Sequence, residues 1–416
     1  MNKSPYIDVR TIPVLVLILS LAVILALGGC ANNPTTPNLY VPNPSTAPAP
    51  TVTSITPPGG GLSGVTVLTI TGTNFSPDPA KDLVFFDNKL ATVSQATTTQ
   101  LTLVAPNYAK DSASVQVAVY RAAQYSAPVY YSLTSPVSNF GNLGVTDVPW
   151  GIATDAQGNL YVSFQSDSIY KFTPSGTKSG FAKTGTITKW TALKMGPGGV
   201  LFGTRTLPAI YQIPAGSSTV TPWVAFGNLG TVYDIDFDQN GNIWACGSNS
   251  SVYRIRTSDQ DVKAFPCDGN LRSVRVYNGY VYFGGTMNSD GLDRVVRFKI
   301  ITPDSLGPQE TYFEYSSASM YATGTSIYAI TFSSTGEMFV ATDLPDPILL
   351  VPVGGSAGAT QTFFPGILSP TLHLFAWGSG SSLYAVKGTA SGGVITASKS
   401  IQKITTQKAS APYYGQ

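Results

Sequence analysis

A repeat of six copies in the last two thirds of the chain is the feature that most restricts its fold. In each copy a turn is followed by an apolar strand, as in "QGNLYV", "NGNIWA" and "TGEMFV", with the first apolar position at Leu160, Val200, Ile243, Val281, Met338 and Leu383. Most intervals are about 40 to 45 residues, the length of one four-stranded β-propeller blade. A further strand follows in every copy, from "SIYKF" to "SIQKI". The sequence therefore predicts a six-bladed β-propeller over residues 134–406.

The stretch "FGNLG" indicates how this ring closes. It occurs at residues 140–144 and again at residues 226–230, where the outer strand of the second blade runs into the third. The first occurrence has no repeat before it, and the last repeat ends near Ile404 after three strands. We therefore expect residues 137–143 to supply the missing outer strand of the last blade, since closure removes exposed strand edges.

The first copy carries a family resemblance. "VPWGIATDAQGNLYVSFQSDSIYKF" resembles the NHL repeat in its Pro-x-Gly-Ile start, its Asp-x-x-Gly-Asn turn and its Ile-x-x-Phe third strand, here Pro149, Gly151, Ile152, Asp155, Gly158, Asn159, Ile169 and Phe172. The fourth copy lacks the Asp-x-x-Gly turn. The resemblance implies a propeller like those built from NHL repeats. It supports this architecture more strongly than it supports membership of the NHL family.

Residues 51–133 precede the repeats. In this segment apolar and polar residues alternate with a period of two. Short runs rich in Val, Thr, Tyr and Phe are separated by Gly, Pro and Asn, a pattern typical of a β-sandwich. "SITPPGGG", "VTVLTITGTNF", "VFFDNKLA" and "VYYSL" resemble the IPT/TIG domain, an immunoglobulin-like module of cell-surface receptors and bacterial exoproteins. The resemblance implies a spacer or packing partner, with a binding face as the alternative. The expected fold class is thus all-β, an immunoglobulin-like β-sandwich followed by the propeller.

The N-terminus has the pattern of a secretion signal. Lys3 and Arg10 flank the start of an apolar run over residues 12–27, and "LGGC" ends at Cys30. A signal peptide over residues 1–29 fits better than a membrane span, which needs about 20 apolar residues. "LGGC" resembles the bacterial lipobox, which implies cleavage before Cys30 and lipidation of its thiol.

Lipidation would attach the protein to a membrane, and residues 30–50, rich in Pro, Asn and Thr, are expected to form a tether. The expected location is the bacterial cell envelope, outside the cytoplasm. Ala31 after the cysteine resembles an outer-membrane address in a host with two membranes.

The charge balance restricts the partners. The chain has 24 Lys and Arg against 22 Asp and Glu, and charged residues make up 11%, compared with roughly 25% in an average globular protein. No basic cluster is present to bind phosphates, which excludes nucleic acid as a partner. We expect a protein or glycan partner.

The repeats place aromatic residues at equivalent positions. Ten residues before each first apolar position stand Trp150, Trp190, Tyr233, Leu271, Tyr328 and His373. Equivalent positions of a propeller form a ring, and this ring would lie near one mouth of the channel. Aromatic faces there could stack on a sugar or hold a peptide. The alternative is packing between blades, because Tyr233 lies on the same strand face as Ile235 and Phe237.

Two acidic residues have no counterparts in the other copies. Asp234 and Asp236 share one strand face and are candidates for calcium binding or acid–base chemistry. No other cofactor is expected. Asp238 matches Asp155 and Ser333 in other copies and is expected to be a hairpin-turn residue.

The sequence offers little for catalysis. His373 is the single histidine, which excludes a His-rich zinc site, and no "GxSxG" motif is present. The gluconolactonase and regucalcin group resembles this architecture and implies a metal-binding Glu in the first blade, but the three Glu are at Glu310, Glu314 and Glu337. The virginiamycin B lyase group implies a His with acidic partners, and no comparable cluster is found. We expect a non-catalytic binding or scaffolding protein, with a metal-dependent lactonase or lyase as the alternative. Residues 407–416, after the propeller, are expected to form a C-terminal tail.

Cys246 and Cys267 remain once Cys30 is lipidated. An oxidising compartment favours a disulfide between them. However, a strand is expected to separate them by about 9 to 10 Å, whereas a disulfide needs Cα atoms within about 7 Å. Two buried thiols are therefore the expectation, and a disulfide is the alternative.

Overall fold

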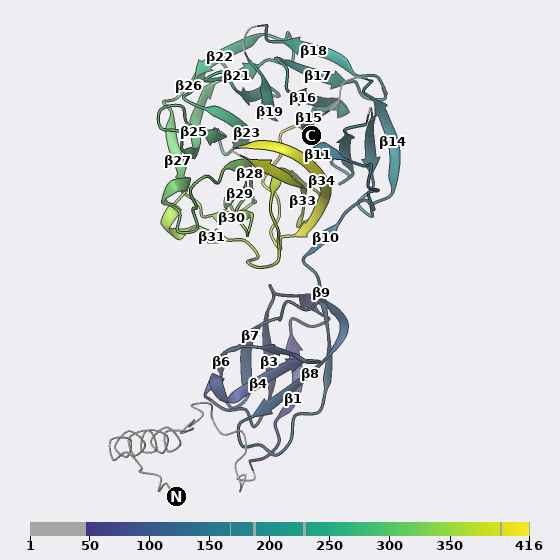
Figure 1. Cartoon of the computed structure of the whole chain (residues 1–416), viewed down its shortest axis with the longest axis vertical. Coiled ribbons are helices and arrows are strands. Elements are labelled where there is room, and N and C mark those ends of the chain that lie inside the picture. The colour runs from purple at the N-terminus through teal and green to yellow at the C-terminus, as the bar shows by residue number, and fades with distance from the viewer. Residues whose placement is uncertain (1–46, 167, 186–188, 228–229, 392, 416) are drawn as a thin grey trace, which may run out of the picture.

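The computed structural model contains two β domains in succession (Figure 1). It describes residues 47–415 except 167, 186–188, 228–229 and 392. The expected signal peptide, the expected lipidation site Cys30 and most of the expected tether lie outside the described residues. Within the described ranges, no helix is long and apolar enough to cross a membrane.

The first domain is a β-sandwich of two sheets. One has the order β1-β3-β7-β6 and the other β2-β9-β8-β4-β5, in which β2 and β9 are parallel. The strands are β1 (Thr51–Thr56), β2 (Gly61–Leu62), β3 (Val67–Thr73), β4 (Asp82–Phe86), β5 (Lys89–Ala91), β6 (Val93–Ala96), β7 (Gln100–Val104), β8 (Lys110–Val119) and β9 (Val129–Thr134), with a 3-10 turn η1 (Pro79–Lys81).

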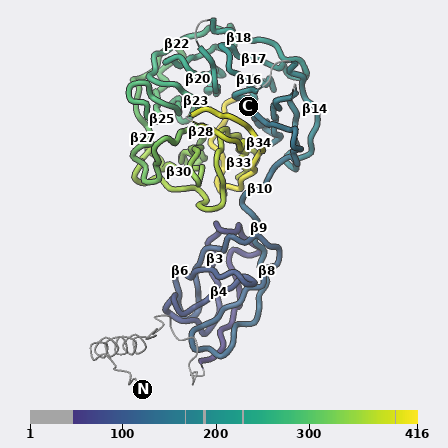
Figure 2. Tube along the Cα trace, viewed as in Figure 1, coloured from purple at the N-terminus to yellow at the C-terminus, as the bar shows by residue number. Residues whose placement is uncertain are grey.

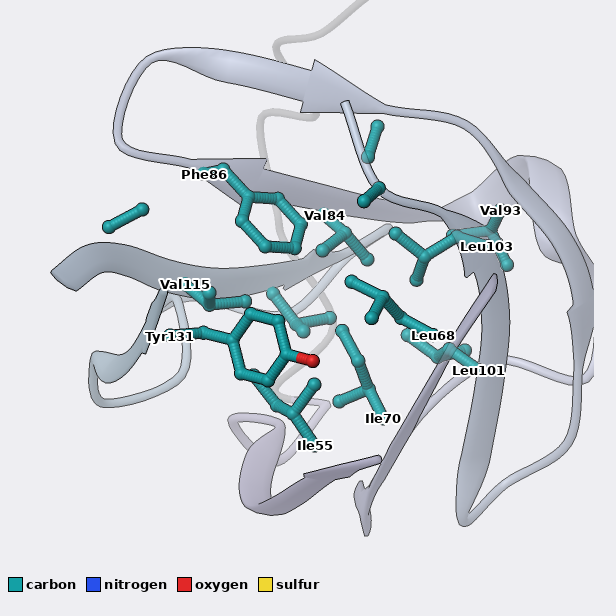
Figure 3. Close-up of a cluster of buried hydrophobic side chains, with 14 of the residues drawn as sticks. Ile55, Leu68, Ile70, Val84, Phe86, Val93, Leu101, Leu103, Val115 and Tyr131 are labelled. Carbon is teal, nitrogen blue, oxygen red and sulfur yellow. The ribbon is translucent and has the colours of Figure 1, made fainter. Parts of the chain in front are cut away.

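The core of the sandwich follows from the alternation in its strands. Leu68 and Ile70 point inward from β3, and Val84 and Phe86 point inward from β4; all four are fully buried (Figure 3). Gly72 is required by a close approach, because a Cβ there would lie 1.9 Å from the carbonyl oxygen of Thr51. The predicted sandwich is therefore confirmed as an apolar core between two sheets.

The second domain is a ring of sheets around a channel, a β-propeller (Figure 1). In the described part of the chain there are six sheets, each running from an inner strand to an outer one and each containing one copy of the repeat. The inner strands are β11 (Pro149–Thr154), β15 (Trp190–Met195), β19 (Val232–Phe237), β23 (Asn270–Tyr277), β28 (Ile327–Phe332) and β32 (Leu372–Trp377). The second strands are β12 (Leu160–Phe164), β16 (Leu201–Arg205), β20 (Ile243–Gly247), β24 (Tyr280–Thr286), β29 (Met338–Thr342) and β33 (Ser382–Ser391).

The outer half of each blade completes the sheets. The third strands are β13 (Ser168–Phe172), β17 (Ala209–Ile213), β21 (Ser251–Ile255), β25 (Asp293–Thr302), β30 (Ile348–Val351) and β34 (Val394–Thr405). The outer strands are β14 (Lys178–Lys183), β18 (Thr221–Ala225), β22 (Val262–Pro266), β27 (Glu310–Glu314), β31 (Gln361–Thr362) and β10 (Val137–Asn139). A short β26 (Ser305–Leu306) extends β25, and 3-10 turns lie at η2 (Pro197–Gly199), η3 (Tyr315–Ser317) and η4 (Ala357–Ala359).

The ring closes as the "FGNLG" repeat predicts. Strand β10, directly after the sandwich, pairs antiparallel with β34 near the C-terminus, with Val137 opposite Ile404. In Figure 2 the blue β10 leads from the sandwich to the last, yellow blade. The closing sheet thus combines strands from both ends of the domain.

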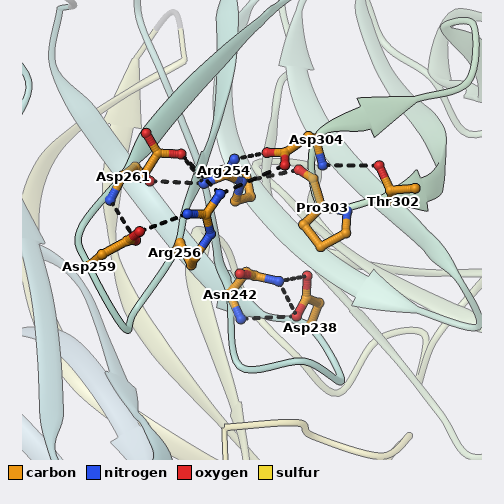
Figure 4. A network of polar contacts seen from close by, with 9 residues as sticks. All are labelled: Asp238, Asn242, Arg254, Arg256, Asp259, Asp261, Thr302, Pro303 and Asp304. Atoms are coloured by element: carbon orange, nitrogen blue, oxygen red, sulfur yellow. Dashed lines mark hydrogen bonds and ion pairs between the residues drawn. The ribbon is translucent and has the colours of Figure 1, made fainter.

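Polar side chains fix several of the blade connections. Asp238 accepts hydrogen bonds from the backbone and side-chain nitrogens of Asn242 (Figure 4). It also accepts from Trp244 Nε1, as expected of a hairpin-turn residue. Arg254 on β21 is fully buried and pairs with Asp261 at 2.8 Å and with Asp304 of the next blade. The sequence reasoning missed this link between blades.

The tail that follows β34 packs against the propeller. Ala411 N donates to Phe332 O at 3.0 Å, and Tyr413 Oη donates to Met195 O at 2.6 Å. Lys408 forms an ion pair with Glu337 at 2.8 Å. The tail therefore lies across the end of the channel where the inner strands finish.

Candidate functional site

Every inner strand of the propeller has a β-bulge close to its start. The pairing with the second strand shifts at this point in all six blades. A bulge leaves a residue without a cross-strand partner and redirects its side chain. In the first blade the bulge contains two residues, Trp150 and Gly151. One residue from each blade borders a single cavity of about 220 Å³: Trp150, Thr191, Tyr233, Arg272, Tyr328 and His373. We call this set the aromatic mouth.

The structure agrees with most of the ring expected from the repeats. Trp150, Tyr233, Tyr328 and His373 border the same cavity. Trp190 also borders it, but it lies one residue before the bulge and is 1% exposed within its blade. The reason is that β16 begins at Leu201, one residue later than expected.

Leu271 does not belong to this set. It is fully buried in an apolar cluster, and Arg272 takes its place in the mouth. The hairpin of the fourth blade is one residue shorter than the others, because Val276 pairs with Val281 whereas Phe237 pairs with Ile243. Counting ten residues back therefore overshoots by one.

The aromatic groups of one side of the mouth are held by their neighbours. The ring centroids of Trp150 and His373 are 6.3 Å apart, and Trp150 Nε1 donates to Gln165 Oε1 at 3.3 Å. His373 Nε2 lies 3.3 Å from Ser398 Oγ on β34, and burial lowers the pKa of His373 to about 3. His373 is therefore neutral near pH 7 and suits contact with a ligand better than proton donation.

On the other side of the aromatic mouth, the positive charge of Arg272 is neutralised by a carboxylate. Tyr328 Oη donates to Asp343 Oδ2 at 3.1 Å. The Arg272 guanidinium lies over the Tyr328 ring, 5.8 Å from its centroid, and is paired with the buried Asp293. This side therefore offers aromatic surface without an uncompensated charge.

The hairpin of the last blade adds an apolar wall. Gly393, Val394 and Ile395, at the tip between β33 and β34, border the cavity. In Figure 1 the yellow β34 crosses the face of the propeller near its centre. Trp190 Nε1 is buried beside the cavity and has no hydrogen-bond partner in the described part of the chain. The cavity thus combines apolar walls with an unused donor.

Asp234 and Asp236 lie deeper, and each is next to a cation. Asp234 Oδ2 accepts from Arg275 Nη1 at 2.9 Å and from Ser273 Oγ at 3.1 Å. Asp236 Oδ2 accepts from the backbone of Val276, and its Oδ1 is 3.6 Å from Lys194 Nζ. Among the described residues there is no group of three or more His, Cys, Asp or Glu able to hold a metal ion. Each candidate carboxylate thus has a cation as its neighbour, whereas calcium takes about 6–8 oxygen ligands.

Burial acts on the pKa values of Asp236, Lys194 and Arg275. It raises the pKa of Asp236 and lowers that of Lys194. Burial also opposes the charge of Arg275, but the attraction of Asp234 and Asp236 outweighs it and raises the pKa of Arg275. The carboxylates therefore serve as counter-ions within the channel.

The sequence reasoning missed Lys194 and Arg275. Both occupy the position of Asp236 in their own blades, opposite an aromatic residue of the second strand. The repeat contained this signal, since the six equivalent positions are Ala153, Lys194, Asp236, Arg275, Thr331 and Ala376. We call this set the lower ring.

Cys246 and Cys267 are both buried and unbonded, which is the expected pair of thiols and not the alternative disulfide. Cys246 lies on β20 and Cys267 follows β22, with β21 between these strands. Burial raises the pKa of Cys267 to about 12 and that of Cys246 well above its usual value. Both side chains therefore behave as small apolar groups.

Comparison with known proteins supports the two-domain architecture. The family model of the IPT/TIG domain matches residues 50–133, so the sandwich is an IPT/TIG domain. None of the curated proteins compared with the chain is similar to it in sequence.

Several solved structures share the fold. A putative phosphatase from Bacteroides thetaiotaomicron has a TM-score of 0.56 and 13% identity, covering 86% of this chain and 97% of that one. An auxiliary nutrient binding protein from the same species has a TM-score of 0.53 and 13% identity, covering 88% and 98%. A gluconolactonase from Xanthomonas campestris has a TM-score of 0.50 and 11% identity, covering 65% and 89%. At these identities the likeness shows the fold alone.

Proposed function

We propose that this protein is a lipid-anchored component of the bacterial cell envelope that binds a glycan at the aromatic mouth without catalysing a reaction. The observation that carries the proposal is the series of six bulges, which gather Trp150, Tyr233, Tyr328 and His373 around one cavity. Aromatic faces suit the apolar face of a sugar ring, and the unused Trp190 Nε1–H suits a hydroxyl oxygen.

The size of the cavity favours the end of a glycan over a folded partner. Its volume of about 220 Å³ is smaller than the roughly 300–1,000 Å³ typical of drug-sized ligand sites. A sugar unit at the end of a chain fits such a space, while the rest of the glycan would extend over the face of the propeller. One structure that matches 88% of this chain is described as an auxiliary nutrient binding protein, which is compatible with this role.

The binding proposal is tested by screening the full-length protein in detergent against bacterial and dietary glycans, followed by calorimetric titration. Trp150→Ala and Tyr233→Ala each remove one aromatic wall, and we expect each to weaken binding at least about tenfold. Tyr130→Ala is the matched control, because Tyr130 is an exposed aromatic residue of the sandwich. Equal affinities of all three variants and the wild type would contradict the proposal, and binding of a protein in place of any glycan would change the ligand class.

The anchor proposal rests on Cys30 in "LGGC". Acyl chains on this residue would hold the protein at the membrane, and in a host with two membranes we expect the outer one. Cells fed a labelled fatty acid should label the wild-type protein and not Cys30→Ser. Equal labelling of both would contradict lipidation at Cys30.

A further inference from the structure

A second cavity lies at the opposite end of the channel from the aromatic mouth. Its volume is about 180 Å³. It is bordered by the lower ring, by turns that join first and second strands, such as Asp155 and Gly378, and by the tail residues Ser410 and Tyr413. The aromatic mouth is formed where the inner strands begin, so this cavity is a separate site, which we call the lower cavity.

The lower cavity contains two polar groups with unused hydrogen-bonding capacity. Asp236 is 3% exposed, and its Oδ1 has no hydrogen-bond partner within the described residues. Lys194 Nζ lies 3.6 Å from this oxygen, too far for a good hydrogen bond, and the described part of the chain provides no other acceptor for it. A buried acceptor without a hydrogen bond is costly, and a molecule that lies between Asp236 Oδ1 and the Lys194 ammonium can hydrogen-bond to both.

The charges that face the lower cavity determine the charge of that molecule. Among the described residues that border it, Lys194 pairs with Asp236, Arg275 pairs with Asp234 directly behind the wall, and Asp155 pairs with Lys171 at 3.7 Å, so the charges are balanced. A charged ligand would add a buried charge without a counter-ion, which is strongly unfavourable. The ligand is therefore neutral.

Aromatic side chains form part of the remaining wall of the lower cavity, and the cavity is small. Trp377 and Tyr413 border the lower cavity, and Trp377 Nε1 already donates to Thr331 Oγ1 at 3.0 Å. Their ring faces can contact C–H groups of a ligand. A volume of about 180 Å³ limits the ligand to a small molecule, since drug-sized ligands occupy roughly 300–1,000 Å³.

We propose that the lower cavity binds a small neutral polyol or a single sugar through adjacent hydroxyl groups that bridge Lys194 and Asp236. A hydroxyl both donates and accepts a hydrogen bond, so one hydroxyl accepts from the ammonium while its neighbour donates to Asp236 Oδ1. This site is independent of the glycan site at the aromatic mouth.

Calorimetry on the full-length protein tests the proposal, with erythritol and glucose as probes and 1,4-butanediol as the control without adjacent hydroxyls. We expect at least one probe to bind, and 1,4-butanediol to bind at least about tenfold more weakly. Lys194→Met should weaken binding at least about tenfold. Ala376→Leu should do the same by filling the lower cavity without touching its charges, which keeps the test valid if Lys194→Met fails to fold.

Trp150→Ala separates this proposal from the proposed function. This variant should lose the glycan at the aromatic mouth and keep the polyol at the lower cavity, whereas Ala376→Leu should do the reverse. Absence of binding by both probes would overturn the proposal and leave the lower cavity as a site for water. Equal affinity for 1,4-butanediol, or affinity unchanged in both cavity variants, would overturn it as well.

Discussion

The two domains of this protein fill their interiors differently. The interior of the sandwich is an apolar cluster built on residues such as Leu68 and Phe86. The axis of the propeller instead contains buried charges, among them Arg275 and Asp234. Apolar side chains would stabilise the axis of the propeller as well as buried ion pairs do. Contact with a polar ligand therefore explains better why charged residues are present there. On this comparison we propose a spacer role for the sandwich and the binding role for the propeller.

The strongest test of this contrast is the removal of one buried charge. Arg275→Met leaves Asp234 without its cation, and we expect a loss of about 3–5 kcal/mol from the free energy of unfolding of the propeller. All five tryptophans lie in the propeller, so tryptophan fluorescence during urea unfolding follows this domain alone. Lys110→Met, which breaks an exposed pair of the sandwich, should leave the tryptophan transition unchanged. An equally stable Arg275→Met propeller would show that the axis does not depend on its charges.

Leu101→Ala tests the other domain. Leu101 is fully buried in the sandwich, and its truncation should cost about 2–5 kcal/mol through lost contacts and a cavity. Circular dichroism should show the sandwich unfolding earlier, while the tryptophan transition and glycan binding remain. A parallel loss of glycan binding would show that the sandwich takes part in the site.

The architecture could be predicted because it depends on patterns that repeat. Turns followed by apolar strands indicated the blades, and the second "FGNLG" indicated the closure by β10. The site was less accessible, because bulges and hairpin lengths shift residues by one place. Thr191 and Arg272 therefore replaced Trp190 and Leu271 as the ring residues of their blades. The path of the tail could not be predicted, since it follows no repeat and depends on contacts such as that of Tyr413 with Met195.

The buried imidazole of the mouth should make the propeller sensitive to acid. Burial lowers the pKa of His373 to about 3, below its ordinary value of about 6.5 in the unfolded chain. The unfolded state therefore binds more protons between these values, and this residue lowers the stability as pH falls from about 6.5 towards 3, by up to about 1.4 kcal/mol per pH unit. In His373→Asn the decline in tryptophan-detected stability should be shallower by that amount. Identical pH profiles would contradict the buried neutral state.

The two thiols should show the smallest effect, a difference in reactivity without a change in stability. Because burial raises the pKa of both Cys246 and Cys267, neither forms a thiolate in the folded propeller. Iodoacetamide should leave both unmodified in the native protein and alkylate both after unfolding in urea without a reductant. Alkylation that requires a reductant would instead reveal a disulfide.

The central claim is that the ligand of this protein binds to the propeller at the aromatic mouth. The most direct measurement is a crystal structure of the protein grown with the tightest glycan from the screen. We predict density for a sugar ring against Trp150 and Tyr233, within hydrogen-bonding distance of Trp190 Nε1. A glycan bound on the sandwich, with the mouth holding only water, would contradict the account.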